Sequence, residues 1–170
     1  EANLFNILDG YTTGIIDANS VITLTGSYSA LNKIYTSSEI NGLGDEAIII
    51  SDTTISASLL NTLDENTTGN IDASAITNFS EDDSDIDADY ASTGITGLGD
   101  EAIIISNTII AASLLNTPDE NITDNIDASA VTNFSGNASD IDAAYASAGI
   151  TGLGDEAIII SDTTIAASLL

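Results

Sequence analysis

Carboxylates recur at three sets of equivalent positions in this chain. Two of the sets belong to the block Gly-Leu-Gly-Asp-Glu-Ala-Ile-Ile-Ile, which begins at Gly42, Gly97 and Gly152, and the third belongs to an Ile-Asp-Ala triplet. Carboxylate oxygens in flexible, oxygen-rich sites are the ligands that Ca²⁺ prefers in proteins. The recurrence therefore predicts Ca²⁺ as a cofactor. The candidate metal ligands are Asp45, Glu46, Asp100, Glu101, Asp155, Glu156, Asp17, Asp72 and Asp127.

The glycine-acid block also has a purely structural interpretation. Its glycines would turn the chain from a helix into a strand and let neighbouring segments approach closely. The block lacks the Gly-Lys-Ser/Thr of a phosphate-binding loop and the spacing of a dinucleotide fingerprint, and no basic residue lies near it. These features argue against phosphate binding, and both the structural and the cation interpretation stay open.

The charge balance limits the partners of this chain. Twenty-seven acids stand against the single Lys33, with no Arg or His, and the formal net charge is −26. Binding to nucleic acid depends on Lys and Arg, so such a surface repels nucleic acid and anionic membranes and attracts cations. One interpretation is solubility in salty water, where salt screens the self-repulsion. The other is specific binding of Ca²⁺.

The residues available for catalysis are few. The chain contains no His and no Cys, so paired carboxylates of the glycosidase type are the remaining option. An active site needs one asymmetric constellation of groups, whereas these acids occur in triplicate. We therefore expect that the protein is not an enzyme. The apolar runs are too short to span a bilayer, so we expect no membrane insertion.

The acids recur because the whole chain is repetitive. The block returns with a constant 55-residue period, and 36 of 45 positions are identical between residues 61–105 and 116–160. The predicted organisation is one continuous array with a diverged first repeat (1–50), a second (51–105), a third (106–160) and the start of a further one (161–170). A repeat of this length is typical of a solenoid.

Strand patterns define the expected fold class. Ala47-Ile48-Ile49-Ile50 is apolar on both faces, as in a parallel strand covered on both sides. Strands that alternate with helices imply right-handed crossovers and a parallel sheet. We therefore expect an α/β solenoid of short parallel strands and short helices, with half-repeats offset by about 27 residues. One sheet and two sheets remain alternatives. The expected strands lie near residues 15–22, 46–51, 70–76, 101–106, 125–131 and 156–161.

Two helices are expected in each repeat. An apolar stripe predicts the first from Thr54 to about Asp64, and Ile-Tyr pairs predict the second near 84–92 and 139–148. Ser84 or Ser139 would cap the second helix.

Two further positions bear on where the helices end. Gly94 and Gly149 stand where a left-handed residue would terminate the second helix. Pro118 replaces Leu63 in the third repeat and should end that helix early.

The two ends of the chain align with the same expected helix. Residues 1–4 correspond to 56–59, and Leu169-Leu170 correspond to Leu59-Leu60. Either the chain is an excerpt of a longer array, or its ends join head to tail between copies. The second alternative predicts copies of the chain as partners and places Leu169 and Leu170 in the contact.

The run from Leu60 to Ala102 resembles repeats of very large, acidic, secreted surface proteins of cyanobacteria and proteobacteria. It reads Leu-Asn-Thr-Leu-Asp, then Thr-Thr-Gly-Asn-Ile-Asp-Ala-Ser, and later Gly-Ile-Thr-Gly-Leu-Gly-Asp-Glu-Ala. The resemblance implies an extracellular or cell-surface location and a structural, adhesive or filament-forming role. The alternative is a glycan- or protein-binding module of a secreted adhesin, with a glycan or surface receptor as partner.

Overall fold

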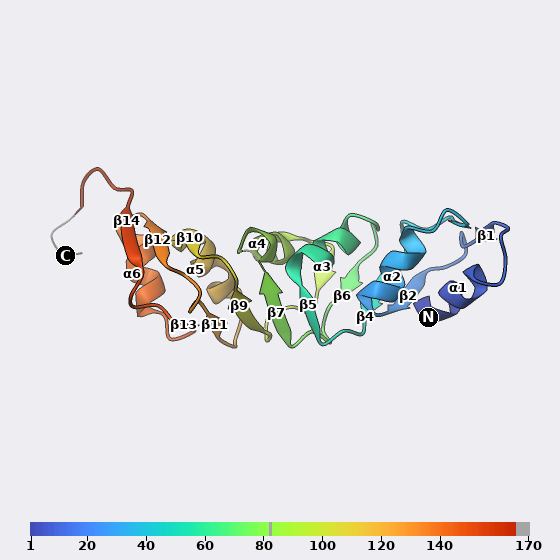
Figure 1. The fold of residues 1–170 in the computed structure, drawn as a ribbon, viewed down its shortest axis with the longest axis horizontal. Helices are drawn as coiled ribbons and strands as arrows, with labels where there is room; N and C mark the ends of the chain where they lie inside the picture. Colours follow the sequence, from blue (N-terminus) through green and yellow to red (C-terminus); the bar gives the residue numbers. More distant parts are fainter. Residues whose placement is uncertain (82, 166–170) are drawn as a thin grey trace. The chain divides into compact units, whose positions relative to one another are not determined.

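The computed structural model describes residues 1–81 and 83–165, and it is an α/β fold with parallel strands and six short helices among these residues (Figure 1). The helices are α1 (Ala2–Asp9), α2 (Tyr28–Tyr35), α3 (Ala57–Asp64), α4 (Asp83–Ala91), α5 (Ala112–Asn121) and α6 (Ala138–Ala146). The strands are β1 (Ile16–Asp17), β2 (Thr23–Gly26), β3 (Ile40–Asn41), β4 (Ala47–Ile50), β5 (Thr54–Ser56), β6 (Ile71–Asp72), β7 (Asn78–Glu81), β8 (Ile95–Thr96), β9 (Ala102–Ile105), β10 (Ile109–Ala111), β11 (Ile126–Asp127), β12 (Asn133–Gly136), β13 (Ile150–Thr151) and β14 (Ala157–Ile160).

The chain divides into two compact units. Unit 1 comprises residues 1–55, 59–76 and 92–98, and unit 2 comprises 56–58, 77–91 and the residues from 99 onward. Unit 1 contains a four-stranded sheet in the order β2-β4-β6-β8 and a two-stranded sheet of β1 and β3. In unit 2, β13, β11, β9 and β7 are neighbours in one sheet, and β10-β12-β14 form another. The sequence left one sheet and two sheets as alternatives, and each unit contains strands of two sheets.

Parallel strands pair at a nearly constant separation in sequence. Ile16 lies opposite Ile40, and Ile109 lies opposite Asn133. The side-chain hydrogen bond from Asn6 to Ala30 has this same sequence separation of 24. The separation is shorter by one position where Ile103 meets Ile126. Paired strands are therefore closer in sequence than the expected half-repeat offset of about 27 residues. That expected offset is wrong.

The 55-residue sequence period contains two unequal segments. The first runs from Ile40 to Ile71 and carries three strands and a helix. The second runs from Ile71 to Ile95 and carries two strands and a helix. One extra strand, β5 in this copy, makes the difference. It also explains why aligning the two halves at one fixed offset gives only a weak match.

All six expected strands are present, within the expected ranges, as β1, β4, β6, β9, β11 and β14. Several of the other described strands were missed because they carry little apolar pattern, whereas β5 lies within the range expected for the first helix. β7, for example, reads Asn-Phe-Ser-Glu, and its Phe79 is completely buried. Such short strands are held by their pairing more than by their own sequence.

The expected second helix is confirmed as α4 and α6, and the first begins later than expected because residues 54–56 form β5. The side chain that caps α6 belongs to Asn137, whose Oδ1 accepts from the Asp140 N–H at 2.8 Å, so the expected Ser139 cap is wrong. Pro118 does not end its helix, because α5 continues to Asn121.

The prediction of left-handed caps at Gly94 and Gly149 is also wrong. Positive φ occurs, among the described residues, at Gly42, Gly44, Gly97, Gly99, Gly152 and Gly154. At Gly94 the close neighbour is a side chain: a Cβ there would lie 2.5 Å from Asp64 Oδ1, so the Asp64 carboxylate would have to move. Leu169 and Leu170, which the sequence analysis placed in a contact between copies, lie outside the described residues.

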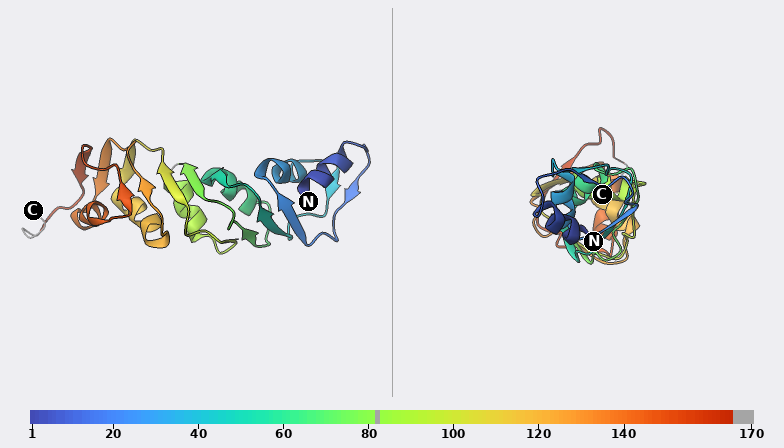
Figure 2. Two further views of the ribbon diagram at one scale, coloured as in Figure 1. Left: turned by 90° about the horizontal axis from the view of Figure 1, so that it is seen from below. Right: turned by 90° about the vertical axis from the view of Figure 1, so that its right-hand side faces the viewer.

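The core of each unit lies between strands and helices. In unit 1, α1 and α2 lie side by side (Figure 2), and Leu31 and Ile34 of α2 are completely buried. In unit 2, α5 contacts both α4 and α6. Each fully buried Leu, Ile or Phe contributes about 1.5–3 kcal/mol by leaving water. In the part of the chain that is described, no helix has the length and apolar character needed to cross a membrane.

Candidate functional site

The glutamates of the glycine-acid block point into the protein. Glu46, Glu101 and Glu156 are 1%, 0% and 9% exposed. The carboxylate of Glu46 accepts main-chain N–H groups from Gly44 and Asp45 at 2.8 and 3.3 Å. Glu101 and Glu156 make the equivalent bonds with the two residues that precede them. Each buried charge is therefore held by the turn that introduces it.

A tyrosine completes each of these sites. The hydroxyls of Tyr35, Tyr90 and Tyr145 donate to Oε1 of Glu46, Glu101 and Glu156, respectively. Each tyrosine lies in the last turn of a helix and precedes its glutamate by the same sequence separation of 11. The sequence analysis did not assign these tyrosines, although this constant spacing in all three copies was a usable signal.

The tyrosine rings are themselves fixed by packing. Tyr90 meets Phe79 edge to face, with ring centroids 6.5 Å apart, and Tyr145 meets Phe134 in the same way at 5.9 Å. Such pairs contribute about 0.5–1.5 kcal/mol beyond their buried area. At these two copies, a strand, a helix and a glycine-acid turn are tied together.

Burial, reinforced by the hydrogen bond to Glu46 and by its negative charge, raises the pKa of the Tyr35 hydroxyl well above its ordinary value. The hydroxyl therefore remains a protonated donor at physiological pH. With one hydroxyl and two N–H groups bound, this carboxylate is occupied inside the protein, and the arrangement is that of a structural tie rather than an open metal ligand.

The aspartates of the same block face solvent. Asp45, Asp100 and Asp155 are exposed, whereas the glutamates that follow them are buried. The two acids of each pair therefore do not converge on one point. The turn that precedes them depends on its glycines: Gly97 has a φ of +85°, and a Cβ there would lie 2.7 Å from the Ser74 nitrogen.

Asp17, Asp72 and Asp127 close turns within their own loops. Oδ1 of Asp72 accepts the Ser74 N–H at 3.0 Å, and Oδ1 of Asp127 accepts the Ser129 N–H at 2.9 Å. The pKa of Asp72 and of Asp127 is lowered by hydrogen bonds from these serines, chiefly from the side chain and to a lesser extent from the main chain. Asp17 makes the same turn with the Asn19 N–H at 3.0 Å.

Equivalent aspartates of successive repeats do not lie opposite one another in the sheets. Because strands pair at a separation well short of the full repeat, Asp72 lies opposite Ile49 on one side and Thr96 on the other. Asp127 likewise lies between Ile104 and Thr151. Equivalent aspartates are a full repeat apart and are therefore not neighbours in a sheet. This arrangement avoids rows of like charge, which are destabilising.

A third recurring aspartate binds a serine that follows the next helix. Asp64 accepts the Ser92 hydroxyl at 2.8 Å, and the Ser92 oxygen in turn accepts the Gly94 N–H at 3.0 Å. The same relay is built on Asp9 in unit 1 and on Asp119 in unit 2. Across residues 1–81 and 83–165, no three acids form a group that could hold a metal ion.

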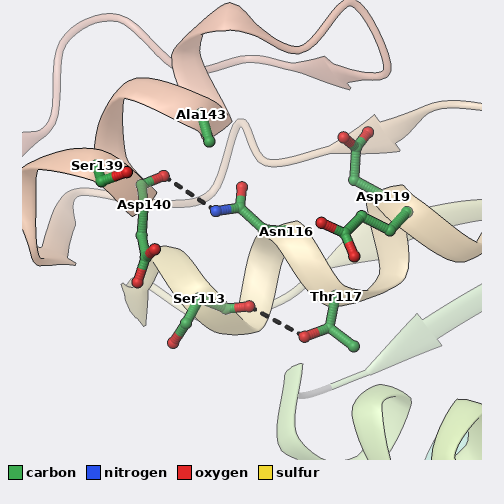
Figure 3. A pocket seen from close by; sticks show the side chains of 8 residues that line it. Ser113, Asn116, Thr117, Asp119, Ser139, Asp140 and Ala143 are labelled. Carbon is green, nitrogen blue, oxygen red and sulfur yellow. Dashed lines mark hydrogen bonds between the residues drawn. The ribbon is translucent and has the colours of Figure 1, made fainter.

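A polar groove lies in unit 2 between α5 and α6 (Figure 3). Its volume is about 300 Å³, and hydroxyl, amide and carboxylate side chains line it. Several of these groups are already bound to one another. The Asn116 Nδ2 donates to the Asp140 carbonyl at 3.0 Å, and the Thr117 hydroxyl donates to the Ser113 carbonyl at 3.1 Å. Asp119 and Asp140 supply negative charge, and the lining contains no aromatic ring.

Comparison with models of known families, with curated proteins and with solved structures finds no match to this chain. The recurrence of the same ties in each copy is therefore the main guide to function.

Proposed function

We propose that this chain is a structural solenoid segment of an extracellular surface, adhesive or filament-forming protein, and that it associates with copies of itself. The nearly constant sequence separation between paired strands supports a solenoid, in which each coil stacks on the one before it. The three 55-residue sequence repeats then become units of two coils that differ by one strand.

The observation that carries the proposal is the use made of the polar residues. The buried glutamates, the serine-bound aspartates and the turn-forming aspartates bind groups of the chain itself, and they do so at equivalent positions of successive repeats. A protein built this way uses its distinctive residues to hold itself together. Spacing, adhesion or polymerisation is the role that such a design serves.

Cations complete the proposal. A net charge of −26 opposes stacking within the chain and between chains, and bound or screening cations relieve that repulsion. The exposed Asp45, Asp100 and Asp155 are available to Ca²⁺ in solution. We place the protein outside the cell or at its surface, in keeping with the resemblance of residues 60–102 to secreted repeat proteins.

Electron micrographs of the purified chain test this proposal. Rods joined end to end, or filaments, are expected at moderate salt. A uniformly monomeric chain at high concentration, with or without Ca²⁺, would contradict self-association.

A glycan-binding module is the second candidate, favoured by the polar groove between α5 and α6. Screening on a glycan array and replacing Asn116 with Ala test it, since Asn116 lines the groove. Asn6→Ala is the matched control, because the Asn6 amide makes the equivalent bond to the Ala30 carbonyl at 2.9 Å in unit 1 and Asn6 does not line the groove. Glycan binding that is lost with Asn116→Ala alone favours this alternative.

A further inference from the structure

We infer that α4 contains a pH-sensitive switch: the Asp89 carboxyl is neutral while α4 is packed, and its ionisation at higher pH releases α4 from α5 and β7. The inference goes beyond the proposed structural role. It concerns one helix of the second repeat and does not depend on self-association.

Asp89 occupies a core position of the repeat. It is 1% exposed, and the equivalent residues of the other two repeats, Ile34 of α2 and Ala144 of α6, are 0% and 1% exposed. Ile86 lies one turn earlier in α4 and is completely buried, so Asp89 belongs to the packed face of the helix. The position is therefore buried in all three copies, and the second copy places an ionisable group there.

The surroundings of this position suit an apolar side chain. Residues 61–105 and 116–160 are identical at 36 of 45 positions, so the segments around Asp89 closely match those that pack around Ala144. An ionised carboxylate loses its hydration when it is buried, and burial therefore favours the neutral form of the acid. Packed α4 should keep the proton on Asp89.

The charges near α4 act in the same direction. α4 contacts α5 and β7, and none of these three elements carries a Lys, Arg or His. The single basic side chain of the sequence, Lys33, is exposed in α2. Negative neighbours disfavour a further negative charge. The other titratable residues of the three elements are Asp83, Asp85, Asp87 and Tyr90 of α4, Glu81 of β7, and Asp119 and Glu120 of α5.

The direction of the pH dependence follows from proton binding. In an open α4, the exposed Asp89 carboxyl ionises near its ordinary value of about pH 4. Above this pH the packed form holds a proton that the open form releases, so raising the pH favours the open form. One proton changes the ratio of packed to open α4 by up to about tenfold per pH unit. A single helix can open in this way while the rest of its unit stays folded.

Hydrogen exchange measured by mass spectrometry between about pH 5 and pH 8 tests the switch, after correction for the intrinsic pH dependence of exchange. Protection of residues 83–91 should fall at least about tenfold across this range, and that of α6 should fall less. Asp89→Ala should abolish the difference between α4 and α6, because alanine already fills the equivalent position of α6. An equal fall in α6, or an unchanged fall in Asp89→Ala, would overturn the inference.

Asp87→Asn is the matched control, since it also removes one carboxylate from α4 but at a half-buried position. It should keep the pH dependence of the parent. Loss of that dependence in Asp87→Asn as well would show that the net charge of the helix, and not the buried carboxyl, is responsible.

Carbon-13 NMR of the side-chain carboxyls tests the ionisation itself without relying on the opening of α4. The Asp89 signal is identified by its absence from Asp89→Ala, and the Asp87 signal by its absence from Asp87→Asn. The Asp89 carboxyl should ionise at least about one pH unit above the Asp87 carboxyl. Ionisation of Asp89 at or below the pH at which Asp87 ionises would overturn the switch, even if α4 exchanged faster at high pH.

Discussion

At the scale of residues, neighbouring acids of the glycine-acid block differ in whether they face the interior or the solvent. Glu101 turns inward to a tyrosine and two main-chain N–H groups, while the adjacent Asp100 remains exposed. Burying a carboxylate is costly unless hydrogen bonds replace its water, and three donors meet that requirement here. The tyrosine is therefore as important to the site as the acid it binds.

Replacing Tyr90 with Phe should lower the free energy of unfolding by about 1–3 kcal/mol, because the buried Glu101 carboxylate loses a donor while the ring packing is kept. Urea denaturation followed by circular dichroism measures the change. Tyr11→Phe is the control, since Tyr11 is 83% exposed, and it should leave stability within about 0.5 kcal/mol of the parent. Equal effects of the two variants would contradict the role assigned to Tyr90.

Acid stability should depend on Asp72 and Asp127. Their pKa values are lowered in the folded chain from an ordinary value of 3.8, so the stability they contribute is present above that pH and is lost as the pH falls through the folded values. In Asp72→Asn/Asp127→Asn, the amide oxygen can still close the turn but does not titrate. The melting temperature of this variant should fall less than that of the parent between about pH 5 and pH 2. Parallel curves would contradict the prediction.

At the scale of elements, pairing overrides local preference. Several strands are very short and are defined by their neighbours, and α5 continues through Pro118 although proline removes a helical N–H. Pro118 is buried in α5, as is the equivalent Leu63 in α3. The packed position is therefore retained in both repeats, and the backbone accommodates the residue.

Pro118→Leu should stabilise the chain by roughly 1–2 kcal/mol, since leucine restores a helical hydrogen bond and already occupies the equivalent buried position. The reciprocal change, Leu63→Pro, should be destabilising. Thermal unfolding of both variants measures the effects. A lower melting temperature for Pro118→Leu would show that the space around residue 118 is shaped for proline.

At the scale of the whole molecule, charge and repetition act against each other. Each repeat adds further acids to the chain, and the single Lys33 cannot balance them. Keeping equivalent aspartates out of adjacent strands reduces the local repulsion, but the net charge of −26 remains. The proposed solenoid should therefore be sensitive to cations.

Millimolar Ca²⁺ should raise the melting temperature more than NaCl of matched ionic strength does. The physical reason is that a divalent cation can bind exposed carboxylates such as Asp45 and Asp100, whereas NaCl acts by screening. Differential scanning calorimetry in the two salts measures the difference. Equal shifts in both salts would reduce the effect to screening alone.

The sequence by itself determined the recurring block, the parallel α/β class, the approximate places of α4 and α6, and the six strands with continuous apolar or Ile-Asp patterns. These features depend on local composition and periodicity, which can be read directly from the order of the residues. Tertiary structure decided the rest. The length of chain between paired strands depends on how many strands and helices lie between them, and the period of the sequence repeat does not contain that number.

The same limit applies to the candidate site. Asp45 and Glu46 are equivalent carboxylates in sequence, but the glycine turn sends one to solvent and the other to Tyr35. Strand pairing likewise places Asp72 opposite Thr96 instead of another aspartate. Side-chain direction and strand partners arise from pairing between distant segments, so only the folded chain distinguishes a structural tie from an open ligand.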